Sequence, residues 1–198
     1  PPYYKYNDAD GTDLYFYHDE TMAEGVYESE DGYGLTVTET SSGATLADDY
    51  GNTKKFNSSG RLVEIKDVYG NKKNIVYSSN NRISRITYTP IQEQTPTTQL
   101  VFTYNTSGAL FSIDDGYDST NYVRFYYSTT YNSGATLANS GYLRRIQYSS
   151  GENCTYEYNS DGTLKSATDG DTGYKILYTY DGFHVSSITE SVGGTQGQ

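Results

Sequence analysis

The sequence contains few of the residues that most directly indicate chemistry, covalent cross-linking or a membrane. It holds one cysteine, Cys154, two histidines, no tryptophan and four prolines in 198 residues. A single cysteine excludes a disulfide within the chain. No apolar run approaches the roughly 20 residues that a membrane-spanning helix needs. We therefore expect neither a disulfide scaffold nor insertion into a membrane.

Basic residues are also scarce. There are 14 Lys and Arg against 25 Asp and Glu, which gives a formal net charge of -11. A nucleic acid or an anionic membrane surface would repel such a chain. We expect no nucleic acid partner, and a cationic partner or none. The first residue is Pro1 and not methionine, so we interpret the sequence as a fragment or a processed product, and a missing signal peptide proves nothing about its compartment.

What the sequence has in abundance is tyrosine. It holds 24 Tyr and 20 Gly, while hydrophobic residues make up only 34%. Tyr favours strands, and its ring can be buried while its hydroxyl reaches water or a backbone group. With Gly, Ser, Thr and Asn between the tyrosines, this composition predicts an all-β protein with many tight turns. Its core is expected to be thin and to consist mainly of Tyr, Ile, Leu and Val.

One short unit recurs six times along the chain. It consists of a turn residue, any residue and an aliphatic, with a second aliphatic three residues later. An aromatic precedes each unit, in four copies by nine residues from the second aliphatic. Six copies with one internal spacing indicate a tandem repeat. The aromatics and aliphatic pairs are Phe56 with Leu62 and Ile65, Tyr77 with Ile83 and Ile86, Tyr104 with Leu110 and Ile113, Tyr127 with Leu143 and Ile146, Tyr158 with Leu164 and Ala167, and Tyr180 with Val185 and Ile188.

Each copy predicts a β-hairpin. Before the turn, aromatic residues alternate, as Tyr156 and Tyr158 do, and a polar turn such as 159–162 follows. Asn and Gly in these turns accept a left-handed backbone. Strict alternation would place two aliphatics three residues apart on opposite faces. Either the first aliphatic folds inward from the turn, or a β-bulge corrects the phase. We reject a helix, because each copy is flanked by turn residues and followed by a β-rich stretch.

These units resemble a known family. The run from Tyr156 to Leu164, the run 178–182 and the run 51–71 are similar to the YD repeat of RHS proteins, teneurins and insecticidal toxin-complex components. The resemblance covers about residues 50–190, although only Tyr180 and Asp181 keep the literal Tyr-Asp pair. It implies tandem antiparallel hairpins that form a continuous curved, twisted sheet.

The resemblance also implies a role. In toxin systems, such arrays form a hollow shell around a C-terminal effector. We therefore expect a non-enzymatic structural segment of a larger bacterial protein that is secreted or displayed at the cell wall or cell surface. Its main partner would be the rest of the same polypeptide, and it would need no cofactor.

The repeats divide the sequence into three parts. Residues 1–49 form a strand-rich lead-in that is expected to cap the first hairpin, with strands at Tyr3–Tyr6, Leu14–His18 and Gly34–Glu39. Residues 50–190 hold the six repeats, with inserted loops at Pro90–Pro96 and around Thr129–Asn139. Residues 191–198 are expected to be a flexible polar tail.

Few residues suggest chemistry. The sequence has no P-loop, no HExxH and no Gly-x-Ser-x-Gly motif. His18 and His184 are interpreted as surface residues, and Cys154 as a partly buried thiol in a strand, although Cys154 and His184 could form a nucleophile and its base. The acidic turns at 8–13 and 169–173 could bind calcium, but they lack EF-hand spacing and are more simply explained as turns.

The main alternative to a structural segment is an adhesin-like module that binds a carbohydrate or a protein. The aromatics at repeat positions are assigned to the core. Only other tyrosines, such as Tyr117, Tyr122 and Tyr142, together with the inserted loops, could form a ligand face. An enzyme is the least favoured interpretation, since the repeat accounts for most residues without a catalytic group.

Overall fold

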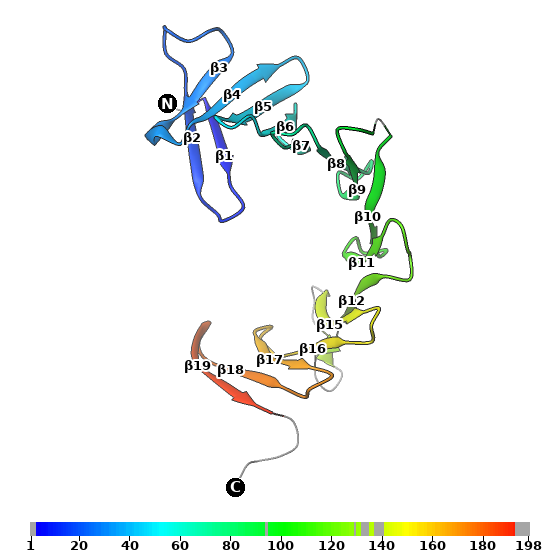
Figure 1. The fold of residues 1–198 in the computed structure, drawn as a ribbon. Coiled ribbons are helices and arrows are strands. Elements are labelled where there is room, and N and C mark those ends of the chain that lie inside the picture. Colours follow the sequence, from blue (N-terminus) through cyan, green and yellow to red (C-terminus); the bar gives the residue numbers. More distant parts are fainter. Residues whose placement is uncertain (1–2, 94, 129, 132–134, 137–140, 193–198) are drawn as a thin grey trace. The chain divides into compact units, whose positions relative to one another are not determined.

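The protein is all β, as predicted. The structure, a computed structural model, describes residues 3–93, 95–128, 130–131, 135–136 and 141–192. Over these residues it contains nineteen strands and one turn of 3-10 helix, η1 (Glu30–Gly32), but no α-helix. Within this described part, no helix is long and apolar enough to cross a bilayer. The chain divides into two compact units, residues 1–99 and 100–198 (Figure 1).

Unit 1 is an antiparallel meander in which every strand pairs with the next. Each of the three lead-in strands expected from the sequence is found, displaced by one residue. β5 of the lead-in pairs directly with β6 of the first repeat. The strands are β1 (Tyr4–Asn7), β2 (Asp13–Tyr17), β3 (Val26–Ser29), β4 (Leu35–Thr40), β5 (Gly43–Asp48), β6 (Thr53–Asn57), β7 (Leu62–Lys66), β8 (Lys72–Tyr77) and β9 (Ile83–Thr89).

Unit 2 continues the same pattern, and its strands again pair with their chain neighbours. A separate two-stranded ribbon occupies part of the insertion after β12, and the rest of that insertion lies outside the described residues, as does most of the expected tail. The strands are β10 (Thr97–Tyr104), β11 (Leu110–Asp115), β12 (Tyr122–Ser128), β13 (Thr130–Tyr131), β14 (Ala135–Thr136), β15 (Tyr142–Tyr148), β16 (Asn153–Tyr158), β17 (Leu164–Asp169), β18 (Lys175–Asp181) and β19 (His184–Ser191).

A β-bulge lies at the same place in all six repeats. In the β16–β17 hairpin, Tyr158 lies opposite Leu164 and Tyr156 lies opposite Ala167, so that Lys165 is the extra residue. The bulge brings the second aliphatic back to the face of the aromatics, which decides the question that the sequence left open. The extra residues in the other hairpins are Val63, Ser84, Phe111, Arg144 and Ser186.

The turns of four repeat hairpins, at 57–61, 78–82, 105–109 and 159–163, share one hydrogen-bond pattern. After Tyr104, the N–H of Asn105 donates to the carbonyl of Ala109, and the N–H of Gly108 donates back to Asn105. This geometry needs a positive φ at its fourth residue, where Gly108 has +85°. The second repeat has Asn81 at that place with φ +61°, and Asn is among the few residues other than Gly that tolerate it.

The fully buried apolar core lies in unit 1. Leu14, Phe16, Val37 and Leu46 form it, and Phe16 is 0% exposed. Although β1 and β6 are five positions apart in the meander, the ring of Tyr6 on β1 lies 5.9 Å from that of Phe56 on β6. The sheet of β1–β6 is therefore rolled on itself around this core.

The repeat residues lie outside this core and are only half-buried, in unit 2 as in unit 1. Tyr104, Ile113, Tyr158 and Leu164 are half-buried on the aromatic face, so the register holds, but the shared layer is thinner than a closed core. Burial is lost in the last hairpin, where Ile188 is 61% exposed. A single sheet layer leaves one side of each such residue uncovered.

Candidate functional site

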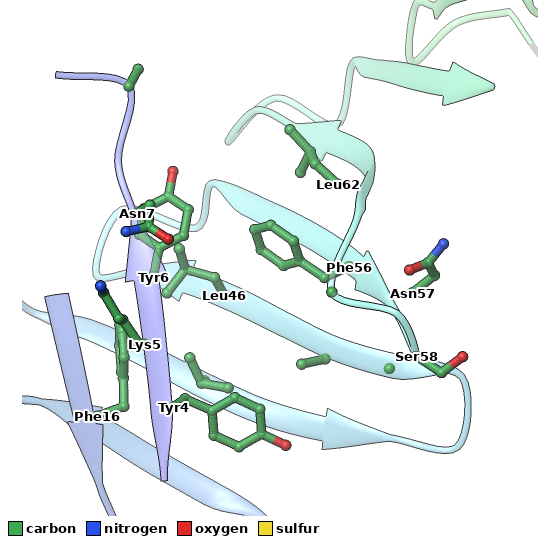
Figure 2. A pocket seen from close by; sticks show the side chains of 15 residues that line it. Tyr4, Lys5, Tyr6, Asn7, Phe16, Leu46, Phe56, Asn57, Ser58 and Leu62 are labelled. Carbon is green, nitrogen blue, oxygen red and sulfur yellow. The ribbon is translucent and has the colours of Figure 1, made fainter. Parts of the chain in front are cut away.

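A cavity lies in unit 1, where the lead-in meets the first repeat (Figure 2). Its volume is about 690 Å³, within the usual range for small-molecule sites. Tyr4 and Tyr6 of β1 face Leu46 of β5 and Phe56 of β6 across it, and Leu62 of β7 lines it further along. Because these strands come from opposite ends of the rolled meander, the cavity depends on the roll.

Close approach of two strands limits the cavity on one side. Gly43 of β5 lies opposite Asn57 of β6, and a Cβ at Gly43 would come within 2.0 Å of the Phe56 carbonyl oxygen. Only glycine fits there without moving backbone. A larger residue at Gly43 would separate β5 from β6 and open the cavity wall.

Two polar side chains at the cavity, Tyr6 and Lys5, are already paired. The Tyr6 hydroxyl accepts a hydrogen bond from Lys54 Nζ at 2.6 Å and donates one to Asp8 at 2.9 Å. Burial acts to lower the pKa of Lys54, but the bond to Tyr6 and the charge of Asp8 outweigh it, so the pKa is raised. Lys5 forms an ion pair with Asp13 at 2.7 Å.

A second hydrogen-bond network joins Tyr4, at the start of β1, to Tyr27 and Glu39. Tyr4 and Tyr27 both donate to Oε1 of Glu39, at 2.7 and 2.9 Å. The hydrogen bond to Glu39 raises the pKa of Tyr4 to about 12 and lowers the pKa of Glu39. A neutral tyrosine and a firmly ionised carboxylate make a structural pair, so this corner of unit 1 offers apolar contact more than proton transfer.

A second feature, which links successive repeats, is a tyrosine hydroxyl. Tyr77 donates its hydroxyl to the Leu62 carbonyl at 2.9 Å, and Tyr158 donates to the Leu143 carbonyl at 2.9 Å. Tyr180 donates to the Leu164 carbonyl at 2.7 Å. In each case a repeat aromatic binds the first aliphatic of the preceding repeat, 15 or 16 residues earlier. Phe could fill the same space but could not make this bond.

Comparisons with known proteins give structural neighbours alone. No family model and no curated protein sequence matches the chain. Similar solved structures include the Photorhabdus luminescens Tc holotoxin pore with mutation TccC3-D651A, at 16% identity and TM-score 0.44, covering 81% of this chain. TcdB2-TccC3-Cdc42 and TcdB2-TccC3 have 17% and 18% identity, TM-score 0.40 and 96% coverage of this chain. The chain spans 11% of the length of each of these chains.

The repeat itself carries more information than these neighbours. All six units that resemble YD repeats in sequence fold as the same bulged hairpin, and three of them are joined to the repeat before by the same tyrosine bond. The shared hairpin agrees with the repeat unit that the sequence predicts. We call β6–β19 the repeat array.

The repeat array has an exposed strand, β19, as its last one. Every residue of β19 is exposed, including Val185 at 51% and Ile188 at 61%, and the neighbouring Phe183 is 82% exposed. In the described residues, β19 pairs with β18 alone. A strand with an open edge is a ready acceptor for another strand.

The structure does not bring Cys154 and His184 together. Cys154 is on β16 and His184 on β19, and β17 and β18 lie between them. Three strand spacings alone amount to about 14 Å. The register adds to this, because Cys154 lies near the start of β18 and His184 lies opposite Asp181 at its end. Burial and the charge of Asp169 raise the pKa of the Cys154 thiol, which suits the partly buried cysteine predicted from the sequence. His18 Nδ1 lies 2.8 Å from the Val26 carbonyl, a structural contact.

The acidic turns use their carboxylates locally. Asp169 accepts the N–H groups of Asp171 and Thr172, which lowers the pKa of Asp169, and Asp10 accepts the N–H of Thr12. Over the described residues, no group of three or more His, Cys, Asp and Glu is arranged to hold a metal ion. Such local contacts are typical of a turn, which is the simpler of the two interpretations.

The three tyrosines proposed as a ligand face lie at two places in unit 2. Tyr117 is 68% exposed in the turn before β12, and Tyr122 begins β12. Tyr142 pairs with Ser128 at the other end of β12, about 20 Å from Tyr122. Its ring packs 4.7 Å from that of Tyr158. Ligand binding through these residues stays a prediction, with Tyr142 apart from the other two.

Proposed function

We propose that the chain is a structural segment of a larger protein, in which each YD hairpin provides the strand edge that pairs with the next hairpin. An enzyme or a ligand-binding site needs a convergent set of free polar groups, and Tyr4, Lys5 and Tyr6 at the cavity of unit 1 already have partners. The proposal rests on the way in which successive hairpins pair. It also rests on β19, whose second edge pairs with no other strand of the described residues.

The junction has a fixed form. Three residue pairs join the return strand of one hairpin to the first strand of the next, as in β17–β18. The residue opposite the second aliphatic is followed, four positions later, by the tyrosine that binds the preceding repeat. Ile176 lies opposite Ala167, for example, and Tyr180 follows it. A hairpin alone is marginal in water, so this junction supplies stability that no single repeat has.

In its finer form, the proposal places the array in a secreted or cell-surface bacterial protein, where it is part of a shell around an effector in the same polypeptide. The support for this form is the resemblance of residues 50–190 to the YD repeats of toxin systems. A non-enzymatic role follows from the same proposal.

The test is to extend the array by one repeat. Because Ala167 and Ile188 are equivalent, replacing the residues from Ser191 onward by a second copy of residues 170–191 places the copied Ile176 opposite Ile188. We expect the amides of β19 to become protected from hydrogen exchange, and the unfolding midpoint to rise. The matched control carries Phe in place of the copied Tyr180, and protection should be weaker.

Two results would count against the proposal. If β19 exchanges equally fast in the extended and original chains, the edge does not accept a repeat. If a copy with its residues scrambled protects β19 as well as the true copy does, the effect is not specific to the repeat.

A further inference from the structure

An alternating row of tyrosine and arginine lies on the outer face of unit 2, away from the repeat aromatics. Tyr122, Arg124 and Tyr126 share one face of β12, whereas Phe125 and Tyr127 occupy the other. Arg145 of β15 lies directly opposite Tyr126 and so belongs to the same face. We call Tyr122, Arg124, Tyr126 and Arg145 the Arg–Tyr row; β12 and β15 are neighbours in Figure 1.

The rings hold both guanidinium groups in place. Arg124 Cζ lies 3.9 Å from the centre of the Tyr122 ring, and Arg145 Cζ lies 4.1 Å from the centre of the Tyr126 ring. The ring of Phe111, on β11, meets Tyr126 edge-on at 6.5 Å. Stacking on an aromatic ring fixes the plane of a guanidinium and leaves its N–H groups to bind at its rim.

Neither guanidinium has an acidic partner within the part of the chain that the structure describes. No carboxylate there lies within 4.0 Å of Arg124 or Arg145, and Arg124 Nε is buried without a hydrogen-bond partner. Two carboxylates elsewhere on the outer face are paired with lysines. Glu64 lies 2.9 Å from Lys55, and Glu157 lies 3.2 Å from Lys175. In a chain with net charge -11, two stacked and unpaired arginines require an explanation.

The spacing of the two arginines indicates the shape of a ligand. Arg124 lies opposite Gln147, so Arg145 is its diagonal neighbour across the strand pair. Such neighbours have Cβ atoms about 7–8 Å apart. In an extended peptide, side chains two residues apart are on one side and about 7 Å apart. Two carboxylates in that arrangement match the two guanidinium groups. A sugar fits less well, because the arginines already cover the tyrosine faces on which it would stack.

We propose that the Arg–Tyr row binds an extended acidic segment of a partner polypeptide, with Asp or Glu at alternate positions. Each carboxylate pairs with one guanidinium, and charge complementarity drives the contact. This binding surface is independent of the role of the array as a scaffold, because it uses the face that the repeat aromatics do not occupy.

The probe is a fluorescein-labelled five-residue peptide, Thr-Glu-Thr-Glu-Thr, titrated against the complete chain at low salt and followed by fluorescence anisotropy. We expect Arg145→Gln to weaken binding about fivefold, and the double change with Arg124→Gln to remove it. Arg145→Lys should restore part of it. The matched control is Arg85→Gln, since Arg85 is exposed at the equivalent position of the second repeat.

Folding of each variant is checked by circular dichroism, and Arg145 is exposed, so its replacement should leave the fold intact. No binding at millimolar peptide would overturn the proposal, as would equal binding by the Arg124→Gln, Arg145→Gln variant. Equal binding of Thr-Thr-Glu-Glu-Thr would exclude the spacing argument. Binding of polygalacturonate but not of the peptide would show that the row takes an acidic glycan instead.

Discussion

The two units of the chain are made from the same hairpin but bury different side chains. Unit 1 fully buries apolar residues, with Phe16 at 0% and Val37 at 5% exposure. In unit 2, the described residues that are fully buried are two serines, Ser112 and Ser166. The comparison shows that the hairpin repeat does not make a core by itself. A core forms where the sheet rolls so that its face meets itself.

The burial of Ser166 in unit 2 is explained by the polar side chains around it. Ser166 donates its hydroxyl to Glu157, whose carboxylate also pairs with Lys165 and Lys175. Glu157 and the two lysines thus form a polar cluster beside the small serine. Unit 2 therefore gains burial from polar side chains on its outer face, while its apolar face stays half-open.

The largest expected effect is on the rolled core of unit 1. Phe16→Ala removes a fully buried ring and should lower the free energy of unfolding by about 3–5 kcal/mol. Denaturant unfolding, with hydrogen exchange to assign the unit, would measure this. Phe111→Ala in unit 2 is the control, because Phe111 is 39% exposed and should cost much less. Equal losses of unfolding free energy in the two variants would contradict the difference in burial between the units.

A smaller loss is expected where the array has only one layer. Ile86 lies opposite Ile75 and is half-buried, so Ile86→Asp should cost about 2–4 kcal/mol by placing a charge among apolar groups. Ser79, in the exposed turn of the same hairpin, should accept Asp with almost no change. Thermal unfolding of both variants is the measurement, and a folded Ile86→Asp protein of normal stability would refute the register.

Loss of one tyrosine hydroxyl should be milder. Tyr158→Phe keeps the ring but removes the bond to the Leu143 carbonyl, which should cost about 1 kcal/mol. Tyr148→Phe, at a 40% exposed ring in the same unit, is the matched control. A Tyr158→Phe protein with unchanged unfolding in denaturant would mean that the hydroxyl does not join the repeats.

The smallest expected effect is on the stability of the protein at acidic pH. Hydrogen bonds from Asn52 and Asn71 hold the pKa of Asp48 and of Asp67 below its ordinary value of 3.8. A carboxyl whose pKa is lower in the folded state stabilises the protein fully above its unfolded pKa and loses that contribution as the pH falls through its folded pKa. Stability should therefore decrease below a pH of about 4. The double change Asp48→Asn, Asp67→Asn should flatten this dependence in acid titrations of unfolding. An unchanged slope would contradict the assignment.

Much of the repeat could be predicted from the sequence, because its determinants are local. Asn105 and Gly108 specify the turn, and alternation of Tyr156 and Tyr158 specifies the face. The spacing of three between aliphatics required either a bulge or an inward turn. The hydroxyl bonds had a signal as well, since Tyr follows the first aliphatic of the preceding repeat by 15 or 16 residues. This spacing was not recognised as a signal, because Phe and Tyr rings fill a core position equally well and only the hydroxyl distinguishes them.

The sequence alone thus determined the hairpin, its turns and the positions that share a face, since each depends on residues within about one hairpin. Only the tertiary structure decided that β1 meets β6 around a cavity, and that Arg124 and Arg145 become neighbours. Those contacts join residues some twenty to fifty positions apart in sequence, and they depend on the roll of the sheet and on the register that a bulge sets. No local pattern fixes either one, because both arise from how successive strands pack against each other.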